Sequence, residues 1–64
     1  MNRILKAKII RRVGTQSDFA RMIGLSEDRL SKIICGRQIP RESERQMISR
    51  KLGVPESELF PASA

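Results

Sequence analysis

The sequence predicts an all-α domain of five short helices around one small core. Apolar residues recur at helical spacing along most of the chain, no alternating strand pattern is present, and glycine or proline separates the helical segments. The chain has 64 residues. We therefore expect one domain spanning residues 1–64, which buries only about 60% of its unfolded surface.

The first helix is expected from about residue 2 to residue 12. Leu5, Ile9 and Val13 form an apolar stripe with a spacing of four residues, and basic residues occupy most of the other faces. Gly14 then interrupts the helical pattern. The stripe predicts an amphipathic helix with one side against the core.

Residues 15–24 predict a second helix with a defined start and end. The Thr15 hydroxyl is suited to cap the first turn, and Asp18 is placed to reach back to the Thr15 amide. Gly24 can adopt the left-handed conformation that ends a helix. The apolar face is made by Phe19, Ala20 and Ile23, and the small Ala20 side chain suits a close helix approach.

A third helix follows after a short turn. Leu25 is apolar and is expected to fill the angle between the helices, while Ser26 caps the next helix, which Gly36 ends. The buried stripe of this helix is made by Leu30, Ile33 and Ile34. Residues 15–36 therefore predict a helix-turn-helix, in which the second helix enters the DNA major groove.

The remaining residues predict a loop, a fourth helix and a last short turn. We expect Ile39 to pack against the core and Pro40 to lie in the first turn of a helix that ends near Leu52. Residues 55–60 form the last turn, and residues 61–64 form a frayed tail. The apolar side of the fourth helix is made by Met47, Ile48 and Leu52.

Composition limits the classes of function. The net charge of +6, from 13 Lys and Arg against 7 Asp and Glu, favours a polyanionic partner, although such charge can also serve solubility alone. The absence of histidine argues against an enzyme, and we expect no metal and no cofactor. A single cysteine and the lack of a long apolar run favour a cytoplasmic, nucleoid-associated protein without membrane contact.

Several segments together resemble the lambda-repressor-like family, which includes Cro-type repressors and Xre-type regulators. The segments are residues 14–26, residues 30–37, Pro40, residues 48–55 and residues 58–60. The resemblance covers roughly residues 4–60. It implies a compact five-helix domain that binds double-stranded DNA through a recognition helix at residues 27–35.

The resemblance also implies which residues contact DNA. Residues on the outward face of the recognition helix are expected to read bases, and residues at the helix starts and on the following loop are expected to bind phosphates. The base-reading residues are Glu27, Asp28, Arg29, Ser31 and Lys32. The phosphate contacts are Thr15, Gln16, Ser26, Arg37 and Arg41.

Alternatives remain open for several of these residues, among them Lys32, for which a phosphate contact is favoured over base readout. Glu27 and Asp28 can accept from cytosine amino groups, or they can serve the helix N-terminus and pair with Arg29 and Lys32 one turn on. Arg29 is the best single candidate to span guanine O6 and N7. Its alternative role is a surface salt bridge to nearby acids.

The chain departs from the family pattern at two places. Cys35 stands where the family often has asparagine, and we interpret it as a small, half-buried filler. Glu44 and Arg45 stand where relatives commonly have an apolar residue. We expect looser packing or a slightly shifted helix there.

The leading hypothesis is a sequence-specific regulator, most simply a repressor, that binds a palindromic operator as a homodimer. The expected dimer surface comprises Val54, Leu59 and Phe60, with core packing as the alternative, favoured for Leu59. A second hypothesis is an antitoxin-like module that binds a partner protein and its own promoter. A third is an architectural protein without sequence preference.

Overall fold

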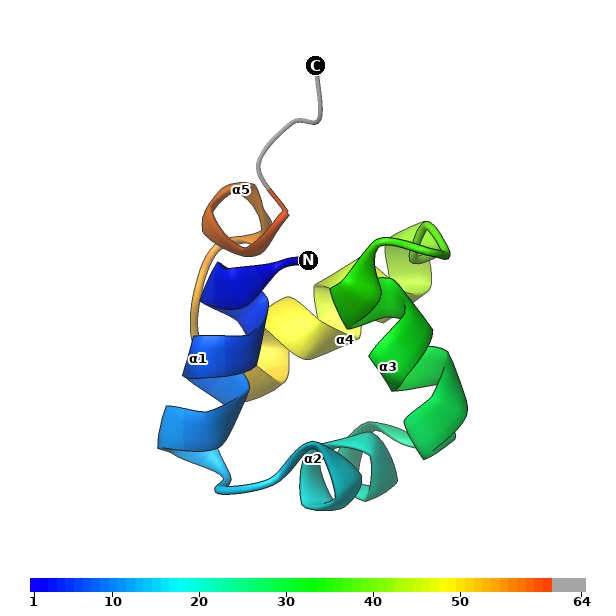
Figure 1. Cartoon of the computed structure of the whole chain (residues 1–64). Helices are drawn as coiled ribbons and strands as arrows, with labels where there is room; N and C mark the ends of the chain where they lie inside the picture. The colour runs from blue at the N-terminus through cyan, green and yellow to red at the C-terminus, as the bar shows by residue number, and fades with distance from the viewer. Residues whose placement is uncertain (61–64) are drawn as a thin grey trace.

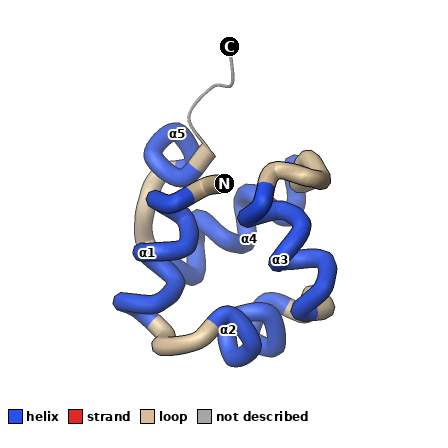
Figure 2. Tube along the Cα trace, in the orientation of Figure 1, coloured by secondary structure: helices blue, strands red, loops and turns tan. Residues whose placement is uncertain are grey.

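The computed structural model describes residues 1–60 and has the predicted all-α architecture (Figure 1). Within these residues the chain is helix and loop, without strands (Figure 2). The helices are α1 (Arg3–Arg12), α2 (Gln16–Ile23), α3 (Glu27–Cys35), α4 (Glu42–Leu52) and α5 (Glu56–Leu59). The frayed tail expected at residues 61–64 lies outside the described residues.

All five helices contribute to one apolar core. Helix α1 contacts each of the other four, and α4 passes between α1 and α3 (Figure 1). The predicted stripes of α1, α2 and α3 all point inward, because their spacing places them on one face of each helix. The buried residues are Leu5, Ile9, Phe19, Ala20, Ile23, Leu30, Ile33, Ile34, Ile48, Leu52 and Leu59.

Thr15 and Ser26 cap α2 and α3 as predicted, but the Asp18 side chain does not reach back to the Thr15 amide and lies 3.8 Å from Arg21 Nη1 instead. The Asp18 amide donates to Thr15 Oγ1 at 3.1 Å. Gly24 has a φ of +74° and ends α2 in the left-handed conformation, which a side chain would strain. The Leu25 amide donates to the carbonyl of Ala20 at 2.9 Å, and the Leu25 side chain packs against the core as expected.

The loop after α3 differs from the prediction. Helix α4 begins at Glu42, and Pro40 lies in the loop, because the Arg41 amide donates to Glu44 Oε1 at 2.7 Å and so fixes the helix start at Arg41. The Ile39 side chain is 85% exposed and does not pack in the core. Met47 is also exposed, so Ile48 and Leu52 alone supply the buried side of α4.

Asn2 joins three segments of the chain. Its Oδ1 accepts from the Leu5 amide at 3.0 Å and caps α1. Its Nδ2 donates to the carbonyl of Leu59 at 2.6 Å, and its backbone amide donates to the carbonyl of Ile34 at 2.7 Å. One residue thus fixes the start of α1 against the ends of α3 and α5.

Replacing Asn2 with alanine should lower the free energy of unfolding by about 1–2 kcal/mol, because both the cap and the bond to Leu59 are lost. Urea denaturation followed by circular dichroism measures this. Asn2→Asp keeps the capping oxygen but lacks the donor to Leu59, so it separates the two contributions. An unchanged midpoint for Asn2→Ala would contradict the capping role.

Candidate nucleic-acid interface

Helix α3 presents a polar face to solvent on the side opposite its core residues. Asp28, Lys32 and Cys35 lie near the centre of this face, since intervals of four and three residues keep side chains aligned. Glu27 and Ser31 are exposed and flank them on one side. We call these five residues the outward face of α3. The major groove of B-DNA is about 12 Å wide, so an α-helix can enter it with such a face toward the bases.

An ion pair occupies the centre of the outward face. Lys32 Nζ lies 2.9 Å from Asp28 Oδ2, and the two side chains are 42% and 78% exposed. The pairing alternative considered for Asp28 is therefore what the free protein contains. Exposed pairs of this kind contribute only about 0–1 kcal/mol, so DNA can replace the contact at small cost.

Arg29 does not lie on the outward face. Its guanidinium contacts Glu44 of α4, with Nη2 to Oε1 at 2.8 Å and Nε to Oε2 at 3.2 Å. The salt-bridge alternative is thus the arrangement in the structure, but the partner is 15 residues away rather than a nearby acid of α3. Of the two roles left open for Arg29, the free protein contains the salt bridge, because helix geometry turns the side chain toward α4.

The polar residues at the start of α4 make specific contacts with neighbouring segments. Glu44 accepts from both Arg29 and the Arg41 amide, and Arg45 donates to the carbonyl of Pro40 at 2.9 Å. Arg45 Nε also lies 3.4 Å from Glu56 Oε1. Polar contacts between the loop, α4 and α5 therefore take the place of the apolar packing that the family pattern suggested.

The candidate phosphate contacts lie at helix starts and on the loop. Thr15 and Ser26 cap α2 and α3, and their hydroxyl hydrogens remain available to an acceptor. Gln16 is half-buried in the first turn of α2. Arg37 and Arg41 are exposed between α3 and α4 and form no ion pair with a described residue. Helix N-termini and free guanidinium groups both favour an anion.

Cys35 is exposed, which corrects its interpretation as a half-buried filler. It follows Asp28 by seven residues and Lys32 by three, so it shares their side of α3. This spacing was already visible in the sequence. The thiol therefore belongs to the outward face, although sequence reasoning did not place it there.

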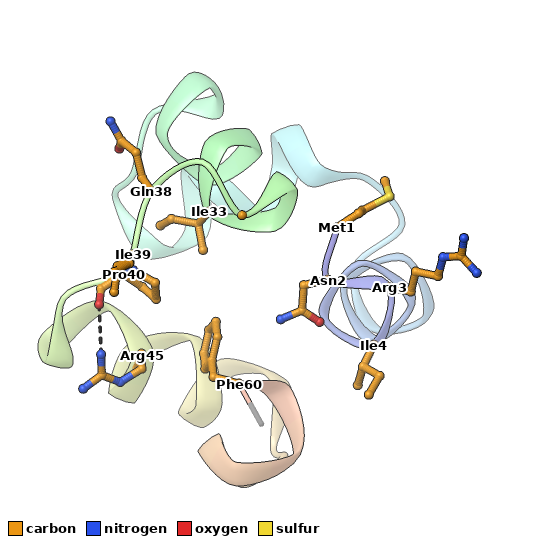
Figure 3. A pocket seen from close by; sticks show the side chains of 11 residues that line it. Met1, Asn2, Arg3, Ile4, Ile33, Gln38, Ile39, Pro40, Arg45 and Phe60 are labelled. Atoms are coloured by element: carbon orange, nitrogen blue, oxygen red, sulfur yellow. Dashed lines mark hydrogen bonds between the residues drawn. The ribbon is translucent and has the colours of Figure 1, made fainter. Parts of the chain in front are cut away.

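The expected dimer residues separate into two groups. Leu59 is fully buried, so core packing accounts for it and it is not available to a partner. Val54 and Phe60 are half-buried against the core. Phe60 also lines a groove of about 720 Å³ between the start of α1 and the loop before α4 (Figure 3).

The groove has apolar walls that the sequence did not reveal. Ile4 and Ile39 are exposed beside it, and Phe60 and Ile33 face the same space (Figure 3). Arg3 and Arg45 are its charged lining residues. Segments from both ends of the described chain form this surface, so no local pattern could have predicted it.

A compact all-α domain with an exposed polar helix after a glycine turn has the architecture of a helix-turn-helix domain. The family model described as helix-turn-helix matches residues 5–59, and the chain belongs to this family, as its resemblance to lambda-repressor-like proteins implied. No curated protein and no solved structure matches the chain. The family is one of DNA-binding regulators. None of the helices in residues 1–60 has the length and hydropathy that a membrane span requires.

Proposed function

We propose that this chain is a sequence-specific regulator, most simply a repressor, that places α3 in the major groove of a palindromic operator. The family match over residues 5–59 is the observation that carries the proposal. The exposed outward face of α3 supports it, since the core holds the opposite side of the same helix. A repressor of this size would act by covering a promoter.

The outward face offers both acceptors and donors to base edges. Asp28 and Glu27 can accept from a cytosine amino group, and Lys32 can donate to a neighbouring phosphate once the Asp28 pair opens. Ser31 can donate or accept. Phosphates repel a carboxylate. Asp28 and Glu27 therefore disfavour DNA sites at which no cytosine amino group can donate to them.

The phosphate contacts would fix the orientation of the protein on the duplex. Thr15, Gln16 and Ser26 lie at the starts of α2 and α3, and Arg37 and Arg41 lie on the loop beyond α3. Such contacts position the protein without reading sequence. They account for the part of the affinity that salt weakens.

A dimer would double the number of base pairs read. We propose that two copies associate on DNA through the groove lined by Phe60, Ile39 and Ile4, whereas Val54 lines a separate hollow beside Arg11 and Leu52. Exposed apolar side chains gather there, and two monomers of charge +6 repel each other in the absence of DNA. Half-sites should lie about one helical turn apart.

Selection of bound sites from a random DNA pool near physiological salt tests the function directly. Enrichment of a palindrome establishes a specific dimeric regulator. Recovery without enrichment indicates an architectural protein, and no recovery indicates that a partner protein is the main ligand. The groove beside Ile39 is the observation that favours the antitoxin-like alternative, which predicts that a second small protein copurifies.

Lys32→Ala should weaken binding to selected and random DNA and reduce the salt slope by about one unit, since one phosphate contact is lost. Titrations at several salt concentrations measure the slope. Lys51→Ala removes the same charge from the last turn of α4, at the end away from the loop that precedes the helix, and should leave the slope unchanged. Equal slopes for both variants would contradict the role of Lys32.

A further inference from the structure

The Arg29–Glu44 pair is unlike the other ion pairs of the described residues. It joins α3 to α4 through two nitrogen–oxygen contacts at 2.8 and 3.2 Å, whereas the other three pairs each have one contact at 2.9–3.8 Å. Its side chains are also the most shielded, at 26% and 14% exposed. Arg29 Nη1 donates in addition to Gln38 Oε1 on the loop. The guanidinium is therefore held from two sides.

Glu44 is fixed independently of Arg29. It accepts from the Arg41 amide at the start of α4, so a hydrogen bond other than those from Arg29 also holds the carboxylate. Hydrogen bonds from Arg29 lower the pKa of Glu44, and the same bonds raise the pKa of Arg29. Both groups are thus charged at neutral pH, and they neutralise each other.

The position of the pair matters for DNA binding. Arg29 follows Asp28 directly and lies in the first turn of α3, where the helix would approach DNA. Transfer of Arg29 to a phosphate would leave Glu44 largely shielded and without its cation. It would also bring the polyanion toward that carboxylate. Both effects oppose transfer.

We propose that Glu44 withholds Arg29 from DNA and so limits sequence-independent binding. Glu44 acts as a positioning residue: it turns a cation of the recognition helix into an internal brace. Lys32 then remains as the cation of α3 that phosphates can attract. This inference rests on the proposed DNA binding. It specifies that, of the two cations of α3, Lys32 contacts DNA and Arg29 does not.

Glu44→Gln tests the proposal, because glutamine keeps an oxygen for the Arg41 amide but leaves Arg29 without its counter-charge. For a short random-sequence duplex, we expect the slope of log K against log salt to steepen by about 0.9. One added phosphate contact also implies binding about eightfold tighter at about 0.1 M salt. Circular dichroism confirms that the variant is folded.

Two controls separate this effect from a general increase in charge. Glu42→Gln removes one negative charge from the same turn of α4 but releases no arginine, so its slope should match that of the wild type. The double variant Arg29→Gln/Glu44→Gln has no arginine to release and should also return to the wild-type slope. Equal slopes for Glu44→Gln and Glu42→Gln, or a steep slope in the double variant, would overturn the proposal.

Arg29→Gln gives an independent test that does not depend on Glu44→Gln. The proposal expects its salt slope to equal that of the wild type, whereas an arginine that contacts phosphate would reduce the slope by about 0.9. A wild-type protein that binds no DNA would contradict the proposed function itself. The two failures are therefore distinguishable.

Discussion

Complete modification of Cys35 with a bulky maleimide should abolish specific DNA binding. The major groove is about 12 Å wide, and a helix with its side chains has a diameter of about 10–12 Å, so little space remains beside α3. Cys35 lies in the last turn of the outward face, and a large adduct there would clash with the groove wall and keep the helix from seating against the bases. We expect specific affinity to fall to that for random DNA, by about a thousandfold or more.

The same cysteine provides the reciprocal measurement. Because the sequence has one cysteine, mass spectrometry of the intact protein reports its modification without ambiguity. Bound DNA should slow the reaction strongly. Full affinity after complete modification, or an unchanged rate on DNA, would show that the outward face of α3 is not the DNA contact.

A matched variant excludes a general effect of the reagent. Cys35→Ser should bind DNA before and after treatment. Adding Ala7→Cys places the thiol on the exposed side of α1, opposite Leu5 and Ile9, and modification there should leave the affinity nearly unchanged.

Ala20→Leu should destabilise the domain by about 1–3 kcal/mol, because Ala20 is 1% exposed in the core where α2 packs against α1, α3 and α4. For a chain of this length, total stability is on the order of 3–10 kcal/mol. The substitution therefore removes a substantial share of the total stability, and the urea midpoint should fall clearly below that of the wild type. DNA binding should decrease in proportion to the unfolded fraction.

Ala7→Leu is the matched control for Ala20→Leu, and urea denaturation of both variants compares a buried site with an exposed one. Ala7 is exposed in α1, and the same substitution there should change stability by less than about 0.5 kcal/mol. If Ala20→Leu has the same midpoint as the wild type, α2 does not approach its neighbours at Ala20. The assignment of the turn would then be incorrect.

Local chemistry made most of the helix-turn-helix predictable. Thr15, Gly24 and Ser26 act on neighbours within a few residues, so their roles follow from the sequence order. The buried stripes of α2 and α3 follow from helical periodicity in the same way. Pro40 misled the prediction of the start of α4, because a side chain three residues beyond the cap, Glu44, determined it.

The site was less predictable because its arrangement depends on distant residues. The salt-bridge alternative for Arg29 pointed to nearby acids, whereas its partner, Glu44, lies on another helix. Ile39 has no local signal that distinguishes a buried loop residue from an exposed one. Leu59 similarly gives no sign of whether it faces the core or a partner.

The bonds made by Asn2 have a consequence for the cooperativity of the fold. The hydrogen bond from its side chain to the Leu59 carbonyl spans 57 positions and joins the two ends of the described chain. Fraying at either end breaks the same bond, so one opening event should expose amides of α1 and α5 together in hydrogen exchange. The first and last turns thus belong to a single unfolding unit, although they are the most distant helical segments in the sequence.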